Sequence, residues 1–232
     1  MYKHTIMALL TIGIVVLNSC KDDDPVTTPV QGTMSLTSEY TTVALAKTSG
    51  AAAVDSIKIT RARFSFKDIK FKNTVEDSVN FKAAPFILEL DLTGAGQTVA
   101  VAEVPFGTYN RLEFDVHRLE NSSIAGRTDT LQFSDFLMGE KYSVIIEGTY
   151  YTGGKDSTFT YRSKIDAKQK IDLDPVLVVS AESSSITTTL QISSAGWFVW
   201  NNQLLDPNDH NNEGRIDENI KASIKLKKKG PN

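Results

Sequence analysis

Side chains able to do acid–base or nucleophilic chemistry are sparse in this chain and lie far apart. The two histidines beyond the N-terminal segment, His117 and His210, have no partner at a recognisable catalytic spacing. The members of a Ser-His-acid triad need not be close in sequence, so a triad stays open. No nucleophile elbow, metalloprotease motif or phosphate-binding loop is present. The sequence therefore predicts a protein that is not an enzyme, with a hydrolase built from dispersed residues as the alternative.

Two carboxylate pairs are the residues that such a hydrolase could use. Glu89 and Asp91, and likewise Asp172 and Asp174, stand two positions apart and would share one face of a strand. Glycosidases use two carboxyl groups about 5–10 Å apart, which this spacing permits. The solvated outer face of a sheet carries the same pattern. A pocket that holds an acid with a strongly displaced pKa would favour the hydrolase.

Two tryptophans close together form a candidate ligand-binding feature. Trp197 and Trp200 are followed by the amides of Asn201, Asn202 and Gln203. Indole rings stack on sugar rings, and amides hydrogen-bond sugar hydroxyls. Aromatic side chains in a β-sandwich also pack as part of the core. We predict Trp197 and Trp200 as a possible glycan contact, which would take the form of a flat aromatic platform.

The segment 206–217 is the most polar stretch of the chain and resembles a calcium-binding loop. Asp206, Asn208 and Asp217 supply oxygen atoms at positions 1, 3 and 12, as in an EF-hand. Position 5 is a histidine, however, and position 6 lacks the usual glycine. Asn and Asp side chains also hold long loops by bonding to the backbone without a metal. Calcium is thus the one possible cofactor, and no other is predicted.

The N-terminal segment has the layout of a secretory signal that ends in a lipidation site. The apolar run from Thr5 to Leu17 is about 13 residues long, whereas a membrane-spanning helix needs roughly 20. Residues 1–19 therefore indicate a signal peptide that is later removed. Cys20, the only cysteine, would become the new N-terminus and carry the lipid. Two or three acyl chains would make membrane attachment effectively permanent.

The residues around Cys20 resemble known lipoprotein signals. Leu17-Asn18-Ser19-Cys20 is similar to a bacterial lipobox. Lys21, Asp22 and Asp23, followed by a further aspartate, are similar to the export signal of Bacteroidetes-type surface lipoproteins. This resemblance implies an outer-membrane protein that is lipid-anchored and faces the cell exterior, with a periplasm-facing anchor as the alternative.

The composition of the remaining chain argues against disulfide bonds and against nucleic-acid binding. With Cys20 acylated, no disulfide can form, so the core must be stable without one. The formal net charge of −3 gives no electrostatic case for nucleic-acid binding. Residues 20–33 carry the lipidated cysteine and then a polar, flexible tether, and residues 34–232 are expected to form the folded domain. The membrane is thus the first predicted partner, reached through the lipid anchor.

From Val54 onward, apolar residues alternate with polar ones, as in strands with one buried face. The phase of this alternation slips between Ile59 and Ala62 and again between Phe66 and Ile69, which predicts bulges where the strand passes from one sheet to another. A first strand is predicted to begin near Met34 and to run to Ala46, and further strands are predicted at 86–92, 99–101, 112–116, 142–146, 159–161, 171–173, 176–178 and 186–192. We therefore predict an all-β fold, an antiparallel Greek-key β-sandwich of about nine strands with at most one short C-terminal helix, at 216–222.

Several segments resemble an uncharacterised group of Bacteroidetes-type lipoproteins with prealbumin-like or immunoglobulin-like sandwich domains. They are 54–71, 81–86, 104–109, 142–150 and 197–224, and together they cover most of the chain after the signal. Their motifs are turn and core signals, so the resemblance implies fold and location but no reaction. The predicted function is a non-catalytic binding or structural role, with a glycan or another outer-membrane protein as the possible partner.

Overall fold

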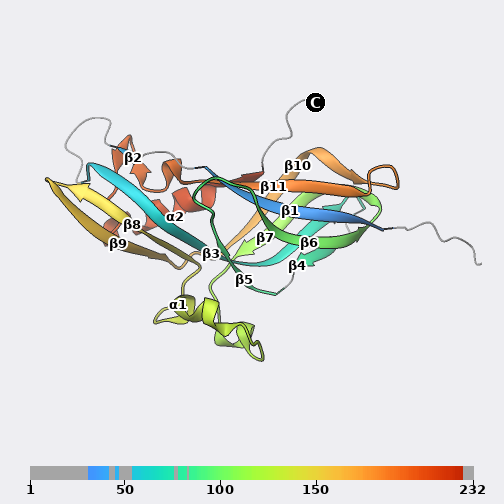
Figure 1. Cartoon of the computed structure of the whole chain (residues 1–232), viewed down its shortest axis with the longest axis horizontal. Helices are drawn as coiled ribbons and strands as arrows, with labels where there is room; N and C mark the ends of the chain where they lie inside the picture. Colours follow the sequence, from blue (N-terminus) through green and yellow to red (C-terminus); the bar gives the residue numbers. More distant parts are fainter. Residues whose placement is uncertain (1–30, 42–44, 47–53, 76–77, 83, 227–232) are drawn as a thin grey trace, which may run out of the picture.

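The computed structural model describes residues 31–41, 45–46, 54–75, 78–82 and 84–226. In this part of the chain two β-sheets pack on one another, and two short α-helices lie beside them (Figure 1). The all-β sandwich predicted from the sequence is confirmed. The four-stranded sheet A has the order β14 (Ile224–Leu226), β11 (Ser185–Ser193), β1 (Gln31–Thr41) and β6 (Gln97–Pro105).

Sheet A departs from a purely antiparallel arrangement at one pair of strands. β1 pairs with β6 in the antiparallel direction but with β11 in the parallel direction, so that Thr33 stands opposite Ser185. Along β1, buried side chains such as Met34 and Leu36 alternate with more exposed ones. This alternation directs one face of sheet A to the core.

β1 begins at Gln31, which is earlier than the domain boundary expected at Met34. The amide of Thr33 donates a hydrogen bond to the carbonyl of Ser184 at 2.6 Å. Gly32 packs against the same carbonyl, where a side chain would collide with it. The last part of the expected tether is therefore a strand, because its backbone is paired on both sides.

Sheet B is built around one long strand, β3, with three short strands along one edge. On the other edge of β3, the sheet continues through two antiparallel pairs of strands. Its members are β10 (Ala167–Val179), β7 (Gly107–Val116), β3 (Ser56–Asn73), β8 (Val144–Thr152), β9 (Lys155–Ser163), β2 (Leu45–Ala46), β4 (Ser78–Lys82) and β5 (Phe86–Glu89).

The two halves of β3 have different neighbours. β8 pairs with the N-terminal half, Ser56–Phe64, and β7 with the C-terminal half, Phe66–Asn73. Phe64 and Phe66 also both pair with β5. A strand residue has only two lateral neighbours, so β8 and β7 must lie along the same edge of β3, one after the other.

The phase slips in the sequence of β3 mark real irregularities in the sheet. The register with β8 shifts between Ile59 and Arg61, and the register with β7 shifts between Lys67 and Lys70. At the second shift Asp68 adopts a positive φ of 54°. The bulges are confirmed, but β3 does not pass to the other sheet as expected. It stays in sheet B and changes its neighbour on one edge.

Between β7 and β8 the chain leaves the edge of β3 and then rejoins it. We call this segment, residues 117–143, the β7–β8 excursion. Its two ends are held by one residue, because Ser65 donates its amide hydrogen to Ser143 and accepts a hydrogen bond from the amide of His117. The excursion projects from the body of the molecule (Figure 1). It contains η1 (Asn121–Ile124), η2 (Thr130–Phe133) and α1 (Ser134–Leu137).

The β7–β8 excursion has a small hydrophobic core of its own and was not predicted from the sequence. Its apolar residues pack on the outer face of sheet B around Ile145. Arg63 lies beneath it and forms ion pairs with Asp135 at 2.7 Å and Glu147 at 2.8 Å. The other members of this small core are Leu119, Ile124, Phe133 and Phe136.

On the inner face of sheet B, the N-terminal half of β3 is covered by a segment that we call the C-terminal cap, residues 194–223. The predicted C-terminal helix is confirmed as α2, which is longer at its N-terminal end than expected. In Figure 1, α2 lies beside β8 and β9. The elements of the cap are η3 (Ser194–Gly196), β12 (Val199–Trp200), β13 (Gln203–Leu204), η4 (His210–Asn212) and α2 (Glu213–Ala222).

The cap attaches to sheet B through aromatic contacts. The ring centres of Trp197 and Phe64 are 5.8 Å apart, and those of Phe198 and Phe159 are 5.4 Å apart. These residues belong to the same continuous core as the buried residues of sheet A. One continuous core therefore lies between β3 and the two parts that cover it, sheet A and the C-terminal cap.

The number of strands exceeds the nine expected. Among the additional strands, β2, β12, β13 and β14 have two or three residues each, too few to produce a visible alternation, and β4 has five. The opposite error occurs in β10, where the two strands predicted at 171–173 and 176–178 form one strand with a register shift between Asp172 and Leu177.

Candidate ligand pocket

The structure corrects the prediction for Trp197. Its side chain has no exposed surface, and its indole nitrogen donates a hydrogen bond to Ser223 at 2.8 Å. It packs against Tyr40 and Phe64 in the core. A buried indole cannot stack on a sugar, so the expected platform of two tryptophans does not form.

Trp200 lies on the surface, at the turn between β12 and β13. Its side chain is 41% exposed. The guanidinium of Arg215 lies 4.1 Å from the centre of its ring and covers one face of it. Arg215 also pairs with Glu218 at 3.3 Å. The exposed indole is therefore already stacked on a cation of its own chain.

The three predicted calcium ligands each make local contacts in place of a common site. Asp206 accepts a hydrogen bond from the amide of Asn208 at 2.8 Å, and the Asn208 side chain donates to Tyr150 at 3.3 Å. Asp217 lies within α2 and accepts a hydrogen bond from Tyr161 at 2.8 Å. No group of three or more His, Cys, Asp or Glu among the described residues could hold a metal ion. Side-chain hydrogen bonds order this loop, and calcium binding by Asp206, Asn208 and Asp217 stays a prediction.

The carboxylate pairs on the strands also have partners. Glu89 pairs with Arg61 at 2.6 Å, and Asp172 pairs with Arg111 at 2.9 Å. Asp91 accepts two hydrogen bonds from Thr93 within a turn. The hydrogen bond from Arg61 holds the pKa of Glu89 below its ordinary value. A glycosidase needs a general acid with a raised pKa, and a carboxylate with a lowered pKa is poorly suited to that role.

The residues predicted to carry the lipid and the export signal, Cys20, Lys21, Asp22 and Asp23, lie outside the described residues. The signal peptide at 1–19 lies outside them as well. Within the part of the chain that the structure describes, no helix combines the length and the apolar character needed to span a membrane.

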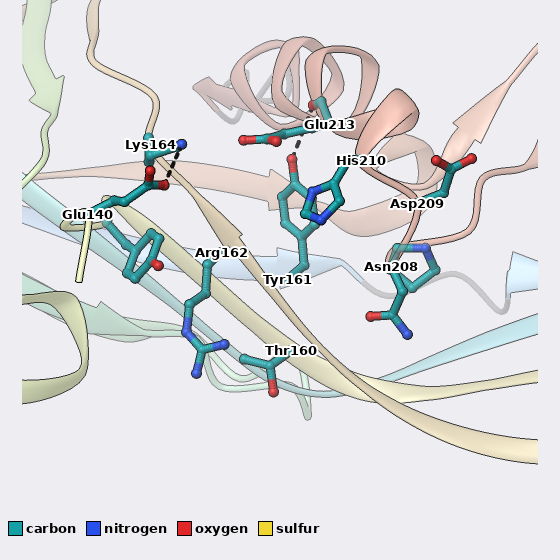
Figure 2. A pocket seen from close by; sticks show the side chains of 11 residues that line it. Glu140, Thr160, Tyr161, Arg162, Lys164, Asn208, Asp209, His210 and Glu213 are labelled. Carbon is teal, nitrogen blue, oxygen red and sulfur yellow. Dashed lines mark hydrogen bonds and ion pairs between the residues drawn. The ribbon is translucent and has the colours of Figure 1, made fainter. Parts of the chain in front are cut away.

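A pocket of about 380 Å³ lies beside β9, the last strand of sheet B (Figure 2). Three separate segments line it. The first is the end of the β7–β8 excursion with Glu140 and Tyr142, and the second is the C-terminal part of β9. The third is the loop of the cap that precedes α2, together with Glu213. Its volume is within the range of small-ligand sites, which is about 300–1,000 Å³.

The strand β9 divides its side chains between the core and solvent. Phe159 and Tyr161 point inward, where both rings meet Phe198 of the cap. Thr160 and Arg162 alternate with them, are exposed, and line the pocket. This is the period of two expected of a strand with one buried face.

The loop of the cap at 206–212 is ordered by hydrogen bonds that its own Asp and Asn side chains make within the loop. The carboxylate of Asp209 accepts hydrogen bonds from the backbone and the side-chain amides of Asn211 at 3.0 and 2.9 Å. The side-chain amide of Asn212 donates to the backbone carbonyl of Asp206 at 3.0 Å. His210 and Asn208 are thereby placed on the rim of the pocket (Figure 2).

Tyr161 joins β9 to the start of α2 at the back of the pocket. Its hydroxyl donates hydrogen bonds to the backbone carbonyl of Glu213 at 3.1 Å and to the carboxylate of Asp217 at 2.8 Å. Burial raises the pKa of the Tyr161 phenol, and the negative charge of Asp217 raises it further. Tyr161 is therefore a fixed structural group that stays protonated.

One ion pair stands at the opposite wall. Lys164 donates to the carboxylate of Glu140 at 2.7 Å, and Figure 2 shows the two side chains meeting there. This hydrogen bond lowers the pKa of Glu140 and raises the pKa of Lys164 above its ordinary value. Both groups thus keep their charges at neutral pH.

A second pocket of about 330 Å³ lies between β5, β6 and the β7–β8 excursion, but its polar groups are already bonded. The Gln97 side chain donates to the carbonyl of Glu89 and accepts from the amide of Asp91, both at 2.8 Å. Arg127 pairs with Asp129 at 2.6 Å and donates to the carbonyl of Pro85. The pocket beside β9 is therefore the better candidate site.

Sequence reasoning found part of this site and missed the rest. The loop of the cap was recognised as the most polar stretch, although with calcium as its ligand. Thr160, Arg162 and Tyr142 carried no signal, because nothing in the sequence shows which strand is an edge strand or which segments lie beside it.

Comparison with known proteins gives little further information. No protein-family model matches the chain, and no curated protein matches it. Among solved structures, it is similar to MbnP from Methylosinus trichosporium at 14% sequence identity. That similarity covers 69% of this chain and 76% of that chain, with a TM-score of 0.38.

Proposed function

We propose that this protein is a lipid-anchored, non-catalytic binding protein of the cell envelope that holds a glycan in the pocket beside β9. The observation that carries this proposal is the mixed set of hydrogen-bonding groups around the pocket. Arg162, His210 and Asn208 offer donors, and Glu213 offers an acceptor. A sugar hydroxyl both donates and accepts, so a polyhydroxylated ligand matches such a set.

The same pocket favours binding over catalysis. The pKa of Glu140 is lowered, and the pKa values of Lys164 and Tyr161 are raised. Each of these shifts moves the pKa of the group away from neutral pH, and a general acid or base works best with a pKa near the working pH. The proposal of a non-catalytic role rests on this direction of the shifts.

The proposal of a lipid anchor rests on the sequence around Cys20. Attachment at Cys20 would confine the pocket to a thin layer above the membrane, so that even a weak site gains from a high local ligand concentration. The segment with Lys21, Asp22 and Asp23 supports display on the outer surface of the outer membrane.

Metabolic labelling with a fatty acid tests the anchor, with Cys20→Ala as the variant. The wild-type chain is expected to take up the label and to fractionate with the outer membrane, whereas the variant should do neither. Protease treatment of intact cells then tests the face on which the domain lies. A wild-type chain without label, or one that is resistant until the outer membrane is broken, would contradict the respective part of the proposal.

Binding is tested by titrating the purified full chain with a panel of neutral and uronic-acid oligosaccharides. Thr160→Trp places a large side chain in the pocket and is expected to abolish binding. Thr158→Trp is the matched control, since Thr158 is exposed on the same strand but does not line the pocket. If Thr160→Trp bound the panel as the wild type does, the assignment of the pocket would be wrong.

A further inference from the structure

We propose that the pocket beside β9 recognises the carboxylate of an acidic sugar through the guanidinium of Arg162. This inference rests on the proposed function and deepens it, because it names the chemical class of the glycan. It depends on three features of the structure: the pairing of the arginines, the position of Arg162, and the charges around it.

Arg162 differs from every other arginine of the chain. The chain has seven arginines, and all of them lie in the described ranges. Arg162 alone has no carboxylate within 4.0 Å among the described residues. The other six form these ion pairs: Arg61 with Glu89, Arg63 with Asp135 and Glu147, Arg111 with Asp172, Arg118 with Asp166, Arg127 with Asp129, and Arg215 with Glu218.

The unpaired guanidinium is positioned before any ligand arrives. Its central carbon lies 5.8 Å from the centre of the Tyr142 ring, at the end of the β7–β8 excursion. Its backbone is held in the sheet opposite Ile145 of β8. An arginine supported in this way loses less side-chain freedom on binding than an unsupported one. Figure 2 shows Thr160 on the same side of β9, where its hydroxyl can add to the contact.

The charges around Arg162 favour a carboxylate over a phosphate. Glu140, Asp209 and Glu213 also line the pocket. Glu140 is neutralised by Lys164, and Asp209 is occupied by its bonds to Asn211. The carboxylate of Glu213 remains, and it repels a doubly charged phosphate more strongly than a singly charged carboxylate. A planar carboxylate also matches one guanidinium through two parallel hydrogen bonds.

The remaining groups account for the sugar part of the ligand. His210 and Asn208 stand on the opposite rim of the pocket, across from Arg162 and Thr160 (Figure 2). A sugar whose carboxylate meets Arg162 would direct its ring hydroxyls toward this rim and toward Glu213. A uronic acid carries a carboxylate and several hydroxyls on one ring, which is the combination that the pocket can satisfy.

Isothermal titration of the full chain with uronic-acid tetrasaccharides tests the inference. The carboxyl-reduced tetrasaccharides of the same linkages, which are neutral, and their sulfated forms are the comparison probes. Arg162→Gln is expected to weaken binding of the acidic probe by about 10- to 100-fold and to weaken binding of the neutral probe, which loses only a hydrogen bond to a hydroxyl, by far less. Arg162→Lys keeps the positive charge but loses the paired N–H donors of the guanidinium, so it should retain only part of the affinity for the acidic probe.

Arg111→Gln is the matched control, because it removes an exposed guanidinium that pairs with Asp172 and does not line the pocket. Equal binding of the acidic and the neutral probe, with no effect of Arg162→Gln, would overturn the inference. If Thr160→Trp still abolished that binding, the proposed function would stand. Tighter binding of the sulfated probe would overturn the choice of a carboxylate. No binding of any probe would contradict both proposals.

Discussion

The two halves of β3 share one strand and one core but are covered in different ways. The C-terminal half, Phe66–Asn73, lies in the sandwich proper, where sheet A packs over sheet B (Figure 1). The N-terminal half, Ser56–Phe64, lies under the C-terminal cap, which consists of short turns, a hairpin and α2. The two ends of the β7–β8 excursion, His117 and Ser143, both hydrogen-bond to Ser65, where the two halves meet.

This difference explains where the candidate site lies. A sheet that covers another sheet presents regular alternation and puts apolar side chains into the interface. An irregular cap must satisfy its own backbone with polar side chains, and it therefore places such groups beside the edge strand β9. The capped half thus contains the pocket, whereas the sandwich half supplies the stable frame.

Trp197→Ala in the cap is expected to have the largest effect. The indole is fully buried and packs 5.8 Å from the ring centre of Phe64, so its loss leaves a large cavity. We expect the free energy of unfolding to fall by about 3–5 kcal/mol in urea denaturation. Trp200→Ala, at an indole that is 41% exposed, should cost about 1 kcal/mol or less. Equal losses at the two positions would contradict the description of the cap.

A smaller effect is expected for Gly148→Ala in β8. A methyl group there would overlap the carbonyl oxygen of Lys58 and would lie 2.7 Å from the ring of Phe159. The required shift of the strand should cost about 1–3 kcal/mol in thermal or chemical denaturation. Gly214→Ala in α2 is the control, since no heavy atom lies within 4 Å of the new methyl group. It should stabilise the protein by about 0.4–1 kcal/mol, and destabilisation by both changes would weaken the argument.

Arg63→Met tests the attachment of the β7–β8 excursion. The Arg63 side chain is 7% exposed and pairs with Asp135 and Glu147. Both carboxylates keep access to water, so we expect a loss of only about 1–3 kcal/mol. Hydrogen exchange should accelerate most in residues 121–137. Arg61→Met removes a surface pair with Glu89 and should cost at most about 1 kcal/mol. If the excursion exchanged at its wild-type rate in Arg63→Met, Arg63 would not be its anchor.

The smallest effect is expected at the exposed Glu140–Lys164 pair. The pKa of Glu140 is lower in the folded chain than its ordinary value, so the pair stabilises the protein above about pH 4.5 and loses this contribution as the pH falls further. Glu140→Gln should leave the melting temperature at pH 7 nearly unchanged and should make its fall below pH 4.5 slightly shallower. A steeper fall in the variant would mean that the sign of this shift is wrong.

The regular strands of the two sheets could be predicted from the sequence, because the alternation of apolar and polar residues is a local property. The phase slips at Ile59 and Phe66 located two of the register shifts of β3 correctly, and the further shift between Lys72 and Asn73 gave no such signal. Gly153 and Gly154 marked the β8–β9 turn, where both adopt a positive φ. Local signals of this kind are strong wherever a strand has one buried and one solvated face.

The candidate site could not be predicted because it depends on contacts between distant segments. Trp197 and Trp200 have the same residue type and similar neighbours, yet one is buried and the other exposed. Only the packing of the cap on Phe64 distinguishes them. Arg162 likewise resembles any exposed strand arginine until the other six are seen to be paired. The missing information was long-range, and no local pattern carries it.

Binding of an acidic glycan beside β9 is tested most directly by hydrogen exchange of the full chain with and without a uronic-acid tetrasaccharide. We expect protection to concentrate in two segments, residues 160–164 at the end of β9 and just after it, and the loop of the cap at 207–213. Sheet A should exchange as it does in the free protein. Protection on β6 or β10 with none at β9, or no protection at saturating ligand, would contradict such binding.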